Sequence, residues 1–135
     1  MIKKLVRAIR VARNWVRALN HAATEDFEKV IKYAEACERI SKANPKFTLL
    51  KAWALGSIFR NEDSIDSLKI AKEKIKVYKK YNQDEKDYLY CYIRFLVEAM
   101  NKSDQVSGLG TADYNLSKVS GDLKSVFPIP SEEST

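Results

Sequence analysis

Apolar residues recur every three or four positions through most of the chain, which is the spacing of one face of an α-helix. The first such pattern covers residues 2–23, where the apolar side of the predicted helix carries Ile2, Leu5, Ala8, Ile9, Ala12, Trp15, Val16 and Leu19. The second follows Thr24, which has the chemistry of an N-cap, and ends before Pro45. Both patterns predict amphipathic helices that pack by one side.

The stretch 44–81 predicts a helical hairpin around which the other helices pack. Asn44 and Pro45 have the order of an N-cap and a first helical residue. Residues 47–59 are apolar nearly all round, which is typical of a helix covered on several sides. Residues 61–64 then predict a turn, and a helix follows whose apolar face carries Ile65, Leu68, Ala71, Ile75 and Tyr78.

The remaining pattern predicts two more helices separated by a loop. Residues 84–101 are apolar almost all round, and residues 102–111 are polar and contain two glycines. Thr111 is then expected to cap a sixth helix over residues 112–127, which packs on the domain and is followed by a flexible tail, 128–135. The prediction is therefore an all-α domain of five main helices over residues 1–101, plus a C-terminal helix.

The predicted helices also repeat. When the chain is shifted against itself by about 38 residues, Trp15 falls on Trp53 and Phe27 falls on Ile65. A helix–turn–helix unit at a period in this range is typical of α-helical repeat arrays. We therefore expect Trp15 and Trp53 to occupy equivalent places in neighbouring helix pairs.

Ala52, Leu55, Gly56 and Phe59 resemble the first helix of a repeat in the tetratricopeptide-repeat (TPR) superfamily, with its Leu-Gly and following aromatic residue. Ser67, Ala71 and Ile75 lie roughly where that family has packing residues in the second helix of a repeat. The resemblance implies stacked antiparallel hairpins that form a right-handed superhelix with a concave groove for a partner peptide. Gly56 is expected to let two helices approach closely.

The composition of the chain limits the number of domains and the class of protein. The 135 residues suffice for one domain, and 45% hydrophobic with 31% charged residues is typical of a soluble globular protein. The sequence has no apolar run long enough to cross a bilayer and no secretory signal, and Cys37 and Cys91 fall beside apolar neighbours. These features predict a cytoplasmic protein with reduced cysteines.

The formal net charge of +6 comes from one helix. Residues 1–24 contain no acid and carry six bases, Lys3, Lys4, Arg7, Arg10, Arg13 and Arg17. The whole chain has 24 bases and 18 acids, so the part after residue 24 is balanced. Three hypotheses fit this helix: a solvated basic face, a patch for a polyanion or acidic partner, and a membrane-surface helix.

Residues for catalysis are scarce. The single histidine, His21, has Glu25 one turn later, a pair that is more often plain helix surface than acid–base machinery. The cysteines and the histidine lie far apart in sequence, and no metal-binding or phosphate-binding motif is present. We therefore predict no catalytic, metal or cofactor site and a protein that is not an enzyme.

The function predicted from sequence is a non-catalytic module that binds another protein or a peptide, in the manner of an adaptor or chaperone. Candidate contact residues are Arg7, Arg10, Arg13 and Arg17 on the first helix and Tyr81, Tyr88 and Tyr92 around the turn near residue 82. Nucleic-acid or other polyanion binding by the basic helix is the alternative, and membrane-surface association is the third hypothesis. A homodimer is compatible with each.

Overall fold

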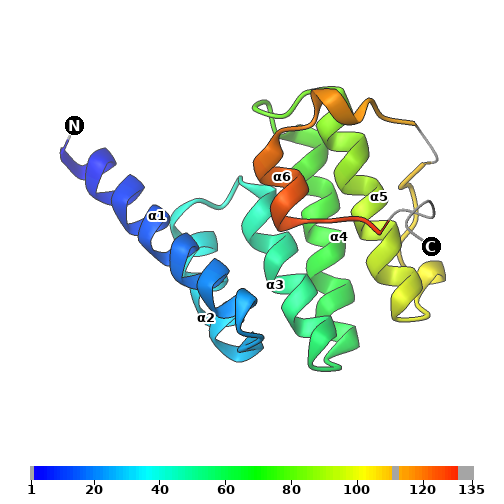
Figure 1. The fold of residues 1–135 in the computed structure, drawn as a ribbon, viewed down its shortest axis with the longest axis horizontal. Helices are drawn as coiled ribbons and strands as arrows, with labels where there is room; N and C mark the ends of the chain where they lie inside the picture. Colours follow the sequence, from blue (N-terminus) through cyan, green and yellow to red (C-terminus); the bar gives the residue numbers. More distant parts are fainter. Residues whose placement is uncertain (1, 111–112, 131–135) are drawn as a thin grey trace.

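The structure, a computed structural model, describes residues 2–110 and 113–130 (Figure 1). These residues form six α-helices and two short 3-10 helices, and no strand occurs among them. The helices are α1 (Ile2–Ala23), α2 (Phe27–Ile40), α3 (Pro45–Ser57), α4 (Asn61–Val77), α5 (Gln83–Ala99) and α6 (Gly121–Val126). The 3-10 helices are η1 (Ser103–Gln105) and η2 (Leu116–Lys118). The predicted all-α class is confirmed.

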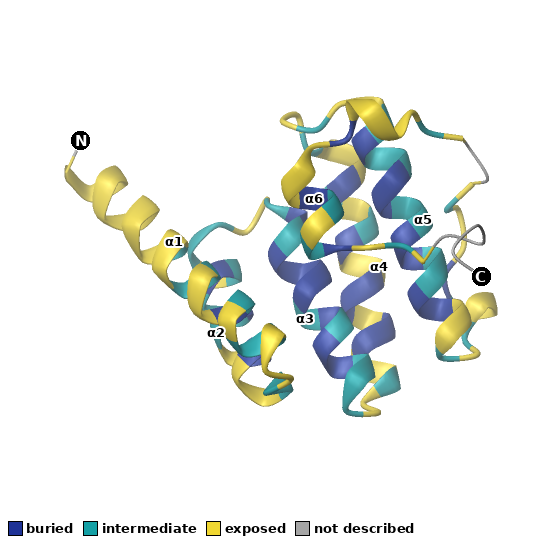
Figure 2. Cartoon of the chain, viewed as in Figure 1, coloured by how far each residue is buried: buried dark blue, intermediate teal, exposed yellow. Residues whose placement is uncertain are grey.

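Helices that follow one another along the chain pack side by side, α1 on α2, α2 on α3, α3 on α4 and α4 on α5. They alternate in direction, and the short α6 lies across the front of α3 and α4 (Figure 1). α3 lies in the middle of this row and is buried nearly all round (Figure 2), as its apolar sequence predicts. Its start is also as predicted, because the Asn44 side chain accepts a hydrogen bond from the Lys46 amide and Pro45 is the first helical residue.

Gly56 lies where α3 comes close to α4 and to the end of α5. A Cβ atom at this position would lie 3.3 Å from Sδ of Met100 and 3.4 Å from Oγ of Ser64. The first distance is shorter than an ordinary van der Waals contact, and the second is at the lower limit of one. The expected close helix approach at Gly56 is confirmed.

The predicted ends of α2, α3 and α4 need correction. Asp26, not Thr24, caps α2, and the Thr24 hydroxyl instead donates to the carbonyl of His21. The chain turns at residues 58–60, because α4 already begins at Asn61. Phe59 therefore lies outside α3, with a positive φ of 64° and 88% of its surface exposed. The apolar pattern continued past the helix end, so it did not show where the hydrogen bonding stopped.

The predicted sixth helix over residues 112–127 is also wrong in extent. Thr111, Ala112 and the predicted tail beyond Pro130 lie outside the described residues. The described part holds only η2 and the six-residue α6. The chain is capped twice here, since the Asn115 side chain accepts from the Ser117 amide and the Ser120 hydroxyl accepts from the Leu123 amide. Two caps five residues apart favour two short helices over one long helix.

Candidate binding groove

A cavity of about 800 Å³ opens between the odd-numbered helices and the last part of the chain; we call it the groove. Its walls include Leu19 and Ala22 of α1, Leu50 and Trp53 of α3, and Leu96 of α5. Small side chains leave the space open, namely Ala22, Ala23, Ala52, Gly56 and Ala99. Among the described residues, the lining contains no Lys, Arg, His, Asp or Glu. The groove is therefore an uncharged, mainly apolar surface.

Residues 119–130, which we call the C-terminal segment, form one edge of the groove. Phe127 is its anchor: the side chain is fully buried, and its ring lies 5.1 Å from the ring of Tyr92, centroid to centroid. The Tyr88 hydroxyl donates a hydrogen bond of 2.7 Å to the Phe127 carbonyl. Val119 and Leu123 of the same segment are also buried. The C-terminal segment thus occupies part of the surface between the helices.

Polar side chains at the start of α5 form hydrogen bonds with the backbone where the C-terminal segment begins. Asn82 and Glu85 form a capping box, in which each side chain accepts from the backbone of the other residue. The second Glu85 oxygen accepts from the Ser120 amide at 3.2 Å, and the Asn82 side chain donates to the Lys118 carbonyl at 2.9 Å. The helix cap of α5 therefore also fixes where the C-terminal segment begins.

Burial shifts the pKa of groups near the C-terminal segment. It raises the pKa of the Tyr88 and Tyr92 hydroxyls, which are uncharged at neutral pH even at the ordinary tyrosine pKa. Lys46 of α3 lies near Asp122 and above the ring of Trp15, and its Nζ is 4.9 Å from the ring centroid. Burial lowers the Lys46 pKa, and the Asp122 carboxylate opposes that effect. Lys46 and Asp122 line a neighbouring cavity of about 310 Å³ and are not among the described residues that line the groove.

The predicted contact tyrosines are not on an open surface. Tyr88 and Tyr92 are each only 3% exposed and lie under the C-terminal segment. Tyr81 is half-buried against Tyr78, with ring centroids 4.6 Å apart. Phe127, which lies 39 positions after Tyr88 and 35 after Tyr92, covers both side chains, so neither is open to a partner while the C-terminal segment is in place.

The predicted arginines are exposed but lie elsewhere. Arg7, Arg10, Arg13 and Arg17 are all exposed on α1, and none of them lines the groove. Arg17 lies over the Tyr33 ring of α2, 5.8 Å from its centroid. The structure therefore separates the two sets of residues that the sequence suggested as one contact surface.

Trp15 and Trp53 both lie on odd-numbered helices but have different aromatic neighbours. Trp15 packs edge-on against Phe47 of α3, and Trp53 packs edge-on against Phe27 of α2. Trp53 lines the groove, and Trp15 lines a neighbouring cavity of about 310 Å³ beside α6. The residues that form the groove were missed as a set, and the only local signal was the run of small residues near Ala52 and Gly56.

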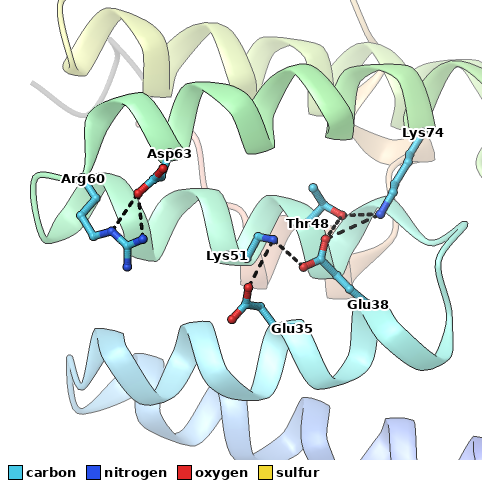
Figure 3. A network of polar contacts seen from close by, with 7 residues as sticks. All are labelled: Glu35, Glu38, Thr48, Lys51, Arg60, Asp63 and Lys74. Carbon is cyan, nitrogen blue, oxygen red and sulfur yellow. Dashed lines mark hydrogen bonds and ion pairs between the residues drawn. The ribbon is translucent and has the colours of Figure 1, made fainter.

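A second polar cluster lies on the opposite side of α3 and joins three helices (Figure 3). Glu38 of α2 accepts a hydrogen bond of 2.8 Å from the Thr48 hydroxyl and pairs with Lys51 at 2.8 Å. Lys74 of α4 donates to the Thr48 hydroxyl at 2.7 Å and lies 3.7 Å from Glu38. Burial lowers the Lys74 pKa, and Glu38 opposes that effect. These contacts link α2, α3 and α4, and we call the four residues Glu38, Thr48, Lys51 and Lys74 the clamp.

The other residues considered for chemistry are His21 with Glu25, possible metal ligands and the two cysteines. The His21 ring stacks on Tyr33, with centroids 5.5 Å apart and planes 4° from parallel, and within the described residues its imidazole makes no hydrogen bond to Glu25. Nor do three His, Cys, Asp or Glu side chains come together as a metal site anywhere in residues 2–110 and 113–130. Cys37 and Cys91 are free thiols, Cys37 buried and Cys91 half-buried, as expected.

Comparisons with known proteins give no relative. No protein-family model matches the chain, and searches of curated proteins and of solved structures find no match either. In the described part of the chain, no helix combines the length and the apolar character that a membrane crossing requires.

Proposed function

We propose that this chain is a non-catalytic module of TPR-like architecture that binds an apolar segment of another protein in the groove. The observation that carries the proposal is the groove itself, which is about 800 Å³ in volume and has no charged side chain among the described residues that line it. Pockets of this size and apolar character are the usual places where proteins bind ligands.

A repeated helix ending supports the TPR-like part of the proposal. α1, α3 and α5 each end with a residue of positive φ that is not glycine, namely Glu25, Phe59 and Asn101. The next amide in each case donates back to a carbonyl five residues earlier: Asp26 to His21, Arg60 to Leu55, and Lys102 to Val97. This is the Schellman pattern. Three odd-numbered helices with the same ending, all lining one groove, fit a row of repeated helical hairpins.

The C-terminal segment indicates what chemistry the groove accepts. Its residues Val126, Phe127, Pro128 and Ile129 are apolar, and it packs against the odd-numbered helices through the Phe127 ring. A partner with apolar side chains and few charges finds the same kind of surface in the open part of the groove. Its affinity comes from burial of apolar area and is therefore insensitive to salt.

The hydroxyls of the groove support a binding role over a catalytic one. Ser57 donates to the Trp53 carbonyl at 2.8 Å, and Ser64 donates to the Ala52 carbonyl at 2.7 Å. In the part of the lining that the structure describes, no histidine, carboxylate or lysine lies next to them to accept a proton. A serine nucleophile needs such a base within hydrogen-bond reach.

A peptide library displayed on phage and selected on the full chain tests the proposal. We expect the selected peptides to be rich in apolar residues and to bind with an affinity that changes little between low and high salt. Ala99→Trp fills the groove and is expected to weaken binding by about tenfold or more, as judged by calorimetry.

Ala43→Trp is the matched control, because Ala43 is exposed in the α2–α3 connection and does not line the groove. It is expected to leave binding unchanged. Selected peptides that are acidic, bind only at low salt and ignore Ala99→Trp would contradict the proposal.

A further inference from the structure

The beginning of α1 extends beyond the helix that packs against it. α1 spans 22 residues and α2 only 14, and every residue from 2 to 10 is exposed. Figures 1 and 2 show this part of α1 projecting away from the other helices. Nothing in the described residues covers it, so its surface chemistry is open to a partner.

The exposed part of α1 carries an apolar stripe, which we call the α1 stripe. It consists of Ile2, Leu5, Ile9, Ala12 and Val16, spaced three and four residues apart along one side of the helix. The exposed fractions are 78% for Ile2, 61% for Leu5 and 48% for Ile9. Four large apolar side chains on one exposed helix face are unusual unless a partner covers them.

The α1 stripe lies beside the side of α1 that packs on the domain. That side carries Trp15 and the fully buried Ala18. Ile9 and Ala18 are separated by about two and a half turns of helix and therefore face opposite directions, whereas Ala12 lines a cavity together with Trp15. The apolar surface of α1 is therefore broad, and the described residues leave the part with Ile2, Leu5 and Ile9 uncovered.

Basic residues occupy other sides of the exposed part of α1. Lys3, Lys4, Arg7, Arg10, Arg13 and Arg17 are exposed, and none of them makes an ion pair within the described residues. Residues 1–24 contain no acid that would neutralise them. The complementary surface is thus negatively charged and also able to cover large apolar side chains.

We propose that the exposed part of α1 lies in the headgroup region of an anionic lipid bilayer, with the α1 stripe toward the acyl chains. A helix with a basic polar face and a separate apolar face is the type that binds parallel to a membrane surface. The phosphates of a nucleic acid would pair with the basic side chains but would leave the apolar side chains of Leu5 and Ile9 exposed to water. A second copy of α1 covers the stripe but brings six more positive charges against the first six.

Binding of the full chain to vesicles tests this surface. We expect the protein to sediment with vesicles of phosphatidylcholine mixed with phosphatidylglycerol and to stay in solution with phosphatidylcholine alone. The double variant Leu5→Ser/Ile9→Ser is expected to lose binding by about tenfold or more, because two apolar side chains no longer enter the bilayer. Arg10→Gln/Arg13→Gln is expected to lose about tenfold, since each adjoining cation contributes separately.

Two control variants have matched chemistry on other parts of the surface. Ile70→Ser/Val77→Ser removes exposed apolar side chains from α4, and Lys79→Gln/Lys80→Gln removes exposed cations after it. Both controls are expected to bind vesicles like the parent chain. All four variants change exposed residues, so melting curves followed by circular dichroism should be unchanged.

Several outcomes overturn the proposal. In the first, Leu5→Ser/Ile9→Ser still binds vesicles, whereas Arg10→Gln/Arg13→Gln binds neither vesicles nor an RNA oligonucleotide that the parent chain binds. That result would make α1 a general polyanion site. Another is a dimer in solution, seen by light scattering, that Leu5→Ser/Ile9→Ser converts to monomer. The third is an absence of sedimentation with anionic vesicles. None of these outcomes alters the peptide test with Ala99→Trp, so the groove is judged separately.

Discussion

At the scale of single residues, the ends of the helices carry strain that the rest of the fold supports. Phe59 has φ 64°, in the left-handed region where residues with a Cβ are disfavoured, and its side chain is almost fully exposed. The backbone hydrogen bond from Arg60 to the Leu55 carbonyl, 2.9 Å long, maintains this conformation. The side chain of Phe59 therefore adds strain and makes little contact with the core.

Phe59→Gly is expected to raise the free energy of unfolding by about 1 kcal/mol, because glycine adopts a positive φ without steric conflict. Phe59→Ala, which removes the ring but keeps the Cβ, is the matched control and should leave stability nearly unchanged. Urea unfolding at equilibrium measures both. A loss of stability in the glycine variant would show that the exposed ring makes a contact that matters.

At the scale of helices, sequence patterns identified each long helix because the evidence for it is local. Asn44 and Pro45 start α3, and Asn82 with Glu85 starts α5, within three residues of each other in each case. The sequence could not show how much of the apolar side of α1 is covered, because that depends on where α2 ends. It also could not show that Tyr88 is buried, because the covering residue, Phe127, is 39 positions away.

The clamp around Glu38 holds α2, α3 and α4 together, and its removal tests how these helices are joined. Glu38→Ala leaves Lys51 and Lys74, whose side chains are 19% and 20% exposed, without their shared carboxylate. We expect a loss of about 2 kcal/mol in unfolding free energy, since Lys74 is left without a carboxylate and Lys51 keeps only the longer pair with Glu35, at 3.8 Å. Asp63→Ala breaks the exposed pair with Arg60 and is expected to cost less than about 1 kcal/mol. Equal effects in urea unfolding would contradict the burial of the clamp.

At the scale of the whole molecule, the C-terminal segment decides how much of the groove is open. It is held by the buried side chains of Val119, Leu123 and Phe127 and by hydrogen bonds to Glu85 and Tyr88. The five long helices make their contacts with one another without it. The segment is therefore expected to leave the surface more readily than any of α1 to α5.

Phe127→Ala is expected to release the C-terminal segment while the main helices stay folded. Loss of a buried phenylalanine costs about 3–5 kcal/mol and leaves the segment held by the smaller side chains of Val119 and Leu123 and by its hydrogen bonds to Glu85 and Tyr88. Hydrogen exchange followed by mass spectrometry should show faster exchange over residues 119–130 and unchanged exchange in α3 and α4. Faster exchange throughout the chain would mean that the segment is an integral part of the core.

The central claim, that the surface between α1, α3 and α5 binds an apolar partner, is tested most directly by NMR mapping of a selected peptide on the full chain. The account predicts that backbone amide shifts change around Ala22, Trp53 and Leu96, with smaller changes in the C-terminal segment. It also predicts that residues 2–10 do not respond. Shifts concentrated on residues 2–17, or scattered over α2 and α4, would contradict it.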